Sequence, residues 1–256
     1  TVEMVEIVQS PRDCAEKAEV VITMLPNGKI LKSVADETIQ YMKEGSIFLD
    51  CSTVDVASAK SVAEIAKNHT IIPLDAPVSG GIGGAKEGTL TFMVGGPDEG
   101  FIKVKELFDI MGQKAVHCGV SGNGQSAKIC NNMILGSTMI ATCEAFALAD
   151  KLGLDRQAMF DVVSTSSGYS WSMNAYCPAP GIGPLTPSDN NYVPGFSSDL
   201  MLKDLTLSQI AAESVDADTP MGYLAMTLYR TFVEQEDGAG KDFSAMLPRF
   251  EKKNRS

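Results

Sequence analysis

Hydrophobic positions in the first half of the chain fall into short apolar runs separated by stretches with helical spacing. Runs of four to six residues that favour Val, Ile and Leu are typical of strands buried in a sheet. They occupy residues 20–24, 46–50, 70–75, 90–94 and 115–118. Helical spacing fills the gaps near residues 30–42, 56–67 and 98–111. Strands that alternate with helices across short connections predict an α/β fold with a doubly wound parallel sheet, as in Rossmann-like domains.

Near residue 120 the pattern becomes helical. Residues 125–152 contain no proline and are rich in Ala, Met, Ile and Leu, which predicts one long helix. Residues 177–195 are dense in Pro, Gly and Asn and predict a loop. The other helical patterns cover residues 156–163, 197–212 and 221–235. We therefore predict two domains, a Rossmann-like domain over residues 1–121 and an all-helical domain over residues 122–256.

A dinucleotide-binding domain ordinarily opens with a strand, a G-x-G-x-x-G turn and a helix. Such a unit takes roughly 30 residues, and fewer than that precede the strand that begins at Val20. We therefore expect the first βαβ unit of the sheet to be missing from this sequence. Residues 122–127 fit G-x-G-x-x-A, but the helix that they open is too long and no second strand follows at βαβ distance. A dinucleotide turn at that position is rejected.

Charge and composition narrow the classes of partner. The formal net charge of −11 argues against nucleic acid, because broad phosphate binding needs a basic face. We identify no apolar stretch approaching the roughly 20 residues that a membrane span requires, so we predict no membrane partner. Six cysteines occur without a C-x-x-C pair or other metal-ligand spacing, which favours a reducing compartment and predicts no metal site.

Lys128 and Asn132 are the first candidates for chemistry. They lie four residues apart at the start of the long predicted helix and therefore on one face of it. A cation beside an amide near a helix N-terminus suits an anionic substrate that carries a hydroxyl group, and the lysine could exchange a proton with that hydroxyl. The residues by themselves leave open a solvated lysine and a surface asparagine in an ordinary first turn.

Other candidates follow the predicted strands. Ser79, Gly80 and Gly81 lie in a glycine-dense segment where backbone N–H groups could turn toward a carboxylate, although a plain loop fits the same letters. Three further residues sit after the first two strands, where they could face a nucleotide or simply cap helices: Leu25, Pro26 and Thr53. The adjacent Lys203 and Asp204 are as consistent with a salt bridge at the protein surface as with a binding site.

These motifs together resemble the β-hydroxyacid dehydrogenases. The glycine-rich run from Gly119 to Lys128 and Asn132 is similar to that family's catalytic signature, and residues 75–81 (DAPVSGG) are similar to its substrate-binding segment. A third motif covers residues 196–204 and ends in Lys-Asp. Within the family, segments around Trp171 and over residues 176–181 look most like the 3-hydroxyisobutyrate dehydrogenases.

The resemblance implies an NAD-dependent oxidoreductase that acts on a small carboxylate substrate. Lys128 would be the general acid/base and Asn132 would orient the substrate. Ser79, Gly80 and Gly81 would bind its carboxylate. The residues that would lie at the cofactor are Leu25, Pro26, Thr53, Lys203 and Asp204. The resemblance further implies a homo-oligomer, a mitochondrial location and a role in valine breakdown.

Two rival hypotheses remain from the sequence. A chain without the glycine turn could be a non-catalytic binding module that keeps the carboxylate segment and the helical domain. Alternatively, it could be a related β-hydroxyacid dehydrogenase that acts on another small 3-hydroxy acid or semialdehyde. Titration with NAD separates the first rival from an enzyme, and a substrate panel separates the second.

Overall fold

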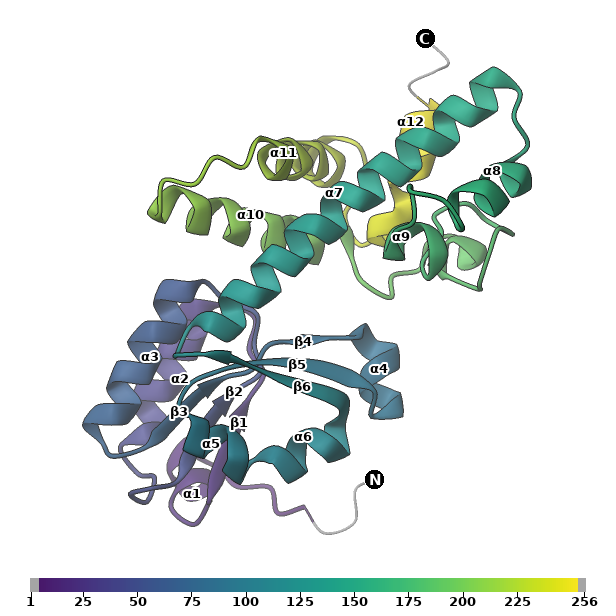
Figure 1. Cartoon of the computed structure of the whole chain (residues 1–256). Coiled ribbons are helices and arrows are strands. Elements are labelled where there is room, and N and C mark those ends of the chain that lie inside the picture. Colours follow the sequence, from purple (N-terminus) through teal and green to yellow (C-terminus); the bar gives the residue numbers. More distant parts are fainter. Residues whose placement is uncertain (1–4, 253–256) are drawn as a thin grey trace. The chain divides into compact units, whose positions relative to one another are not determined.

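The computed structural model describes residues 5–252, which form two compact units that divide between Lys128 and Ile129 (Figure 1). The first unit is an α/β domain and the second is helical, as the pattern predicts. Helix α7 (Asn123–Leu152) begins in the first unit and continues in the second. The predicted division after residue 121 therefore lies just before this continuous helix.

A six-stranded sheet forms the centre of the first unit. Its strands run in the order β1-β2-β3-β5-β4, with β6 also paired to β5. Their bounds are β1 (Val20–Thr23), β2 (Ile47–Asp50), β3 (Ile72–Asp75), β4 (Val78–Ser79), β5 (Leu90–Gly95) and β6 (Gly112–Gly119). β1, β2 and β3 pair in parallel, whereas β5 is antiparallel to β3 and β4 and parallel to β6. The sheet is mostly parallel but mixed, unlike the wholly parallel sheet that alternation predicts.

Helices cover both faces of this sheet (Figure 1). Phe48 packs toward α2 and α3, while its neighbours Ile47 and Leu49 pack toward α5 and α6. Both faces of β2 are thus buried, which explains why this strand reads as a continuous apolar run. The helices of the unit are α1 (Pro11–Ala15), α2 (Gly28–Ile39), α3 (Val56–Asn68), α4 (Gly81–Glu87), α5 (Asp98–Lys103) and α6 (Lys105–Met111).

The single helix predicted over residues 98–111 is interrupted at Val104. Val104 has φ −101° and ψ 9°, outside the helical region, and its side chain is fully buried against the sheet. The break between α5 and α6 thus coincides with the burial of this β-branched side chain. The helical spacing of the sequence does not predict the break.

The second unit packs helices around the C-terminal part of α7. Its core includes the fully buried Phe146, Tyr229 and Phe243. The helices that supply this core besides α7 are α8 (Arg156–Val163), α9 (Trp171–Asn174), α10 (Ser198–Ser214), α11 (Pro220–Gln235), η2 (Phe243–Ala245) and α12 (Met246–Lys252), and the unit also contains the short η1 (Pro187–Asn190). Residues 177–195 form the predicted irregular segment apart from the short η1.

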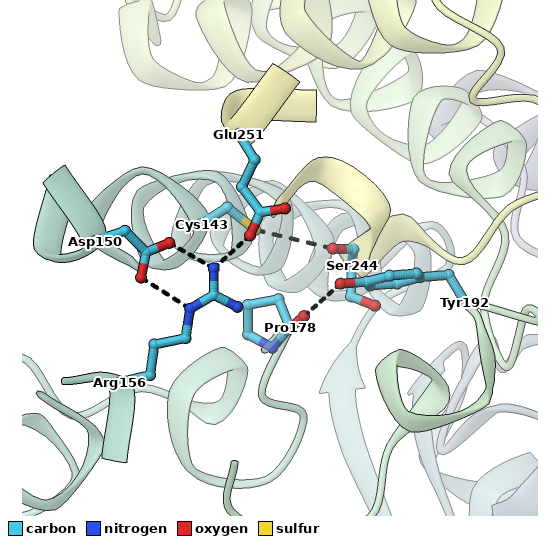
Figure 2. Close-up of polar contacts among 7 residues, drawn as sticks. All are labelled: Cys143, Asp150, Arg156, Pro178, Tyr192, Ser244 and Glu251. Carbon is cyan, nitrogen blue, oxygen red and sulfur yellow. Dashed lines mark hydrogen bonds and ion pairs between the residues drawn. The ribbon is translucent and has the colours of Figure 1, made fainter. Parts of the chain in front are cut away.

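Polar contacts join distant parts of this unit (Figure 2). Arg156 at the start of α8 donates to Asp150 near the end of α7 and to Glu251 in α12. The Tyr192 hydroxyl donates to the Pro178 carbonyl at 2.9 Å. These contacts fix the irregular segment and the last helix against α7.

By length and composition alone, α7 could cross a membrane. The expectation that no segment has this character was therefore wrong. Half of its most apolar window is buried inside the fold, as in the core helix of a soluble protein. Such a helix is weak evidence for a membrane span.

Candidate active site

Strands β1, β2 and β3 end at one edge of the sheet, because their register pairs Thr23 with Asp50 and Asp50 with Asp75. All three residues are buried. Open α/β sheets bind ligands in the loops that follow the carboxyl ends of their strands. Leu25 and Thr53 come directly after β1 and β2, so the register brings both of these predicted cofactor residues to that edge.

A buried hydrogen-bond network joins the first two of these loops. Asp50 Oδ1 accepts from the Thr23 hydroxyl at 2.7 Å and from the Ser52 hydroxyl at 2.5 Å. Ser52 Oγ in turn accepts from the backbone N–H of Leu25 at 2.7 Å. Burial raises the pKa of Asp50, and the hydrogen bonds from Ser52 and Thr23 oppose that rise. Leu25 is half-buried, and the adjacent Pro26 is exposed.

Asp75 links the end of β3 to the start of α7. Its Oδ1 accepts from the backbone N–H of Gly122 at 2.6 Å, and its Oδ2 accepts from that of Gln125 at 3.0 Å. The carboxylate therefore caps the helix from a distant point in the sequence. Burial raises the pKa of Asp75 to about 6, although both hydrogen bonds act to lower it.

The predicted carboxylate-binding residues lie in a short strand and a tight turn, not in a long loop. Ser79 belongs to β4 and pairs with Thr91 of β5. Gly80 and Gly81 then adopt φ values of 130° and 61°, which L residues rarely adopt, and α4 begins at Gly81. Ser79 is half-buried and both glycines are exposed. This turn needs glycine for its backbone, so conformation alone accounts for the Gly-Gly pair.

Helix α7 carries Lys128 and, one turn later, Asn132. Both are buried, at 7% and 1% exposure, which excludes the solvated lysine and surface asparagine that the residues alone left open. A buried lysine amine needs polar neighbours or a ligand in its surroundings. The helix thus holds an amine and an amide at successive turns, away from bulk water.

Within the helical unit, Asn132 is held by Asp204. Its Nδ2 donates to Asp204 Oδ2 at 2.5 Å, while its Oδ1 accepts from Asn131 at 2.8 Å. Lys203 Nζ lies 3.7 Å from Asp204 Oδ1, and the Lys203 side chain is 32% exposed. The structure therefore brings Asn132, Lys203 and Asp204 together, although 70 residues lie between Asn132 and Lys203 in the sequence.

The start of α10, which carries Lys203 and Asp204, is fixed by Asp242. This buried carboxylate accepts from the backbone N–H groups of Gly195 and Phe196 at 3.0 and 3.1 Å, and from the Tyr176 hydroxyl at 2.9 Å. These hydrogen bonds hold the segment that leads into α10.

Sequence reasoning overlooked Asp75 and Gln125 as supports of the site. Asp75 is the first residue of the DAPVSGG motif, and Gln125 lies in the rejected G-x-G-x-x-A match and at the start of the long helical pattern. Both are buried polar residues, at 6% and 0% exposure. Their places, at the end of a predicted strand and in a glycine-rich turn that opens a helix, were the signal in the sequence that could have identified them.

A cavity of about 330 Å³ lies in the helical unit, lined by residues that include Tyr192, Glu236 and Arg249. None of its lining residues is a predicted site residue. The hydrogen-bond networks, unlike this cavity, connect residues at the sheet edge where ligands bind. Among residues 5–252, no group of three or more His, Cys, Asp or Glu side chains has the arrangement of a metal site.

The sheet edge fits a dinucleotide cofactor. The loops after β1 and β2 run side by side, and hydrogen bonds through Ser52 hold them together. Thr53 and Leu25 are half-buried, so each retains some accessible surface at this edge. Preformed loops of this kind suit a ligand that lies across strand ends.

Comparison with known families supports this interpretation. Residues 2–122 match a model described as the NAD binding domain of 6-phosphogluconate dehydrogenase. Residues 122–250 match one described as NAD-binding of NADP-dependent 3-hydroxyisobutyrate dehydrogenase. Together, these matches indicate an NAD(P) cofactor.

Individual relatives agree with the family models. The chain is 44% identical to a 3-hydroxyisobutyrate dehydrogenase of Pseudomonas aeruginosa, over 93% of this chain and 81% of the relative. It is 43% identical to the mitochondrial human enzyme of that name, over 94% of this chain and 73% of the relative. A solved 3-hydroxyisobutyrate dehydrogenase of Mycobacterium tuberculosis with L-serine superposes at a TM-score of 0.91 with 40% identity, covering 97% of this chain and 84% of that one.

Proposed function

The chain belongs to the 3-hydroxyisobutyrate dehydrogenase family of oxidoreductases, and we propose that it oxidises 3-hydroxyisobutyrate to methylmalonate semialdehyde with NAD. In this proposal Lys128 is the general acid/base and the reaction is a step of valine degradation. The observation that carries the proposal is the burial of Lys128 on a helix whose start is anchored to the cofactor edge of the sheet.

Each proposed role follows from chemistry that the residue can perform. Oxidation of a primary alcohol removes a hydride from carbon and a proton from oxygen. Lys128 Nζ receives the hydroxyl proton in the oxidation and returns it in the reverse direction. Asn132, whose amide is oriented by Asp204, positions the substrate hydroxyl. Ser79, Gly80 and Gly81 bind the substrate carboxylate through a hydroxyl and backbone N–H groups.

The cofactor roles stay with the residues at the sheet edge and in α10. Leu25, Pro26 and Thr53 would contact the dinucleotide, and Lys203, with Asp204 beside it, would complete its binding. When bound, the dinucleotide supplies the redox chemistry, since its nicotinamide ring accepts the hydride. The protein residues bind, orient and exchange the proton.

Absorbance at 340 nm tests the function directly. The protein is assayed with NAD and with NADP, using 3-hydroxyisobutyrate, 3-hydroxypropionate, glycerate and L-serine as substrates. The assay is run on the chain alone and on the chain joined to the part of the Pseudomonas aeruginosa relative that the match leaves uncovered. The proposal predicts the highest kcat/KM with 3-hydroxyisobutyrate and NAD in at least one of these forms.

Other results of this assay would support one of the rival hypotheses. A higher kcat/KM with another 3-hydroxy acid would identify a related β-hydroxyacid dehydrogenase. If both forms are well folded and bind NAD but reduce it with none of the substrates, the substrate assignment is wrong. If neither form binds NAD, the chain is a binding module without redox activity.

We propose a homo-oligomer as the assembled state. Large apolar side chains are exposed on α10 and α11, among them Ile210, Met221, Tyr223 and Leu224. Exposed apolar groups of this kind on one unit favour burial against a second copy. Sedimentation equilibrium checks this expectation, which a monomer at micromolar concentration would contradict.

The mitochondrial location implied by the resemblance also remains a proposal. The human relative is named as mitochondrial, but the relative from the bacterium Pseudomonas aeruginosa is equally similar. Family membership by itself therefore selects no compartment.

A further inference from the structure

Gln125 uses both ends of its side-chain amide on the segment that contains Thr53. Its Nε2 donates to the Ser52 carbonyl at 2.8 Å, and its Oε1 accepts from the Val54 N–H at 3.1 Å. These two backbone groups flank Thr53 on either side. Only one orientation of the amide satisfies a carbonyl and an N–H at once, so the geometry fixes the Gln125 rotamer as well as the segment.

The backbone of Gln125 is held at a second point. Its N–H donates to Asp75 at the end of β3, and Gly122, one turn earlier, donates to the same carboxylate. Gln125 therefore connects the loop after β2, the end of β3 and the first turn of α7. Lys128 lies three residues further along α7, on nearly the same helical face.

The connection extends to the loop after β1. Ser52, whose carbonyl accepts from Gln125, uses its hydroxyl to accept from Leu25 and to donate to Asp50. The proposed cofactor residues Leu25 and Thr53 are thus linked by hydrogen bonds to the helix that carries Lys128. All of these contacts lie within the first unit.

We propose that Gln125 is a positioning residue that holds the Thr53 segment and the Lys128 helix in one register, so that cofactor contact and proton transfer are aligned. The proposal rests on the proposed function. Gln125 is fully buried, and burial of an amide is costly unless both of its ends are hydrogen-bonded. An apolar residue of similar length would fill the same space without that requirement, but it would make neither hydrogen bond to the backbone on either side of Thr53.

The test compares Gln125→Met with Gln209→Met. Gln209 lies in α10, outside the site, and accepts from the Thr219 hydroxyl at 3.1 Å. Both substitutions remove a hydrogen-bonded amide and keep side-chain length. Gln125→Met is expected to lower kcat by about 10- to 100-fold, since misplacement of a catalytic group by about 1 Å costs on that order. Gln209→Met is expected to leave kcat within about twofold of the unaltered protein.

Hydrogen exchange supplies a readout that needs no cofactor or turnover. In Gln125→Met, the Val54 amide loses its acceptor, so a peptide that covers residues 52–58 should exchange faster than in the unaltered protein. In Gln209→Met the exchange of this peptide should not change. Equal exchange in the two variants, or kcat within about twofold for both, would overturn the proposal.

Gln125→Glu tests the same contact even if the methionine variant does not fold. Ionised glutamate repels the Ser52 carbonyl, whereas protonated glutamic acid donates to that carbonyl and still accepts from Val54. The kcat of Gln125→Glu, divided by that of the unaltered protein at the same pH, should rise as pH falls. A flat ratio between pH 5 and 8 contradicts the proposal. If the unaltered protein is inactive, the proposed function fails instead, and exchange of the 52–58 peptide still reports on Gln125.

Discussion

The side-chain amide of Asn132 donates a 2.5 Å hydrogen bond to the carboxylate of Asp204, which lies 72 positions later in the sequence. This bond joins α7 to α10 inside the helical unit and fixes the amide plane of a proposed substrate-binding residue. Both partners are nearly inaccessible, at 1% and 3% exposure. A buried pair of this kind is sensitive to any change that leaves two like groups facing each other.

Exchange of the two side chains tests this relationship. Asn132→Asp places two carboxylates in contact, and Asp204→Asn places two amides there, so each single variant should lose about 1–3 kcal/mol of unfolding free energy. The double variant Asn132→Asp/Asp204→Asn restores one donor and one acceptor and should recover at least half of the loss. Chemical denaturation of all four proteins measures the coupling. Additive losses in the double variant would show that the two residues act independently.

Gly124 lies where the start of α7 packs closely against the ends of the strands. A Cβ at this position would lie 2.4 Å from the carbonyl oxygens of both Asp75 and Met93, so the helix would have to shift. Gly124→Ala should destabilise the protein by about 1–3 kcal/mol or more and lower kcat by displacing the Lys128 helix. Gly83→Ala is the matched control in α4, because a Cβ there meets no atom within 4 Å.

Thermal or chemical unfolding of the two glycine variants decides this prediction. Gly83→Ala should be neutral or stabilising by up to about 1 kcal/mol, since alanine favours a helix over glycine. If Gly124→Ala is as stable and as active as Gly83→Ala, the start of α7 is not tightly packed on the strand ends.

The raised pKa of Asp75 should make the stability of the protein depend on pH. Its pKa in the folded protein is raised to about 6 by burial, compared with about 3.9 for an unfolded aspartate. Because the folded state then binds more protons between these values, the contribution of Asp75 to stability is greatest below about pH 4 and is lost as pH rises through about 6. The full change is at most about 3 kcal/mol.

Comparison with Asp75→Asn isolates this contribution. The difference in unfolding free energy between the unaltered protein and the variant should shift against the unaltered protein between pH 4 and 6, then stay constant above pH 7. A constant difference across the whole range would show that Asp75 titrates normally in the folded state.

The ion pairs of Arg156 with Asp150 and Glu251 form a cluster (Figure 2). We expect this cluster to stabilise the protein to a degree that depends on salt and pH. Arg156 holds Asp150 in a two-point contact and also pairs with Glu251. Arg156→Met should cost about 1 kcal/mol, less in 1 M salt. Arg156 lowers the pKa of Asp150, so the cost should be full above the ordinary aspartate pKa and shrink as pH falls below it.

The exposed pair between Arg12 and Glu16 is the control for this cluster. Arg12→Met should leave the unfolding free energy unchanged within the error of the measurement, because this pair is exposed to solvent. Equal costs for the two methionine variants would indicate that the cluster adds nothing to an ordinary surface ion pair.

Much of the fold follows from local sequence patterns. Apolar runs predict the strands, and helical spacing predicts α8 (Arg156–Val163) without error. Other features depend on packing between distant residues. Ser79 belongs to a short strand because it pairs with β5. The glycine-dense sequence around Ser79 does not indicate this pairing. The antiparallel contact of β3 with β5 also comes from tertiary pairing rather than from local preference.

The site is less accessible to sequence reasoning than the fold. Periodicity places Lys128 and Asn132 on one helical face, and the family resemblance gives them roles. Their supports come from far away in the chain, because Asp75 and Gln125 meet across 49 intervening positions and Asn132 meets Asp204 across 71. Only a folded chain shows that these polar residues satisfy one another.

We propose that Lys128 exchanges the substrate proton. The most direct measurement is the single-turnover rate of nicotinamide reduction by 3-hydroxyisobutyrate in Lys128→Met and in the unaltered protein, at saturating substrate and NAD. Methionine keeps an unbranched side chain that reaches as far as the lysine ε carbon, and it carries no proton-transfer group. We predict a rate lower by about 100-fold or more, as expected for loss of a general base, with the NAD dissociation constant changed by less than about threefold. A rate within about tenfold of the unaltered protein would contradict the account.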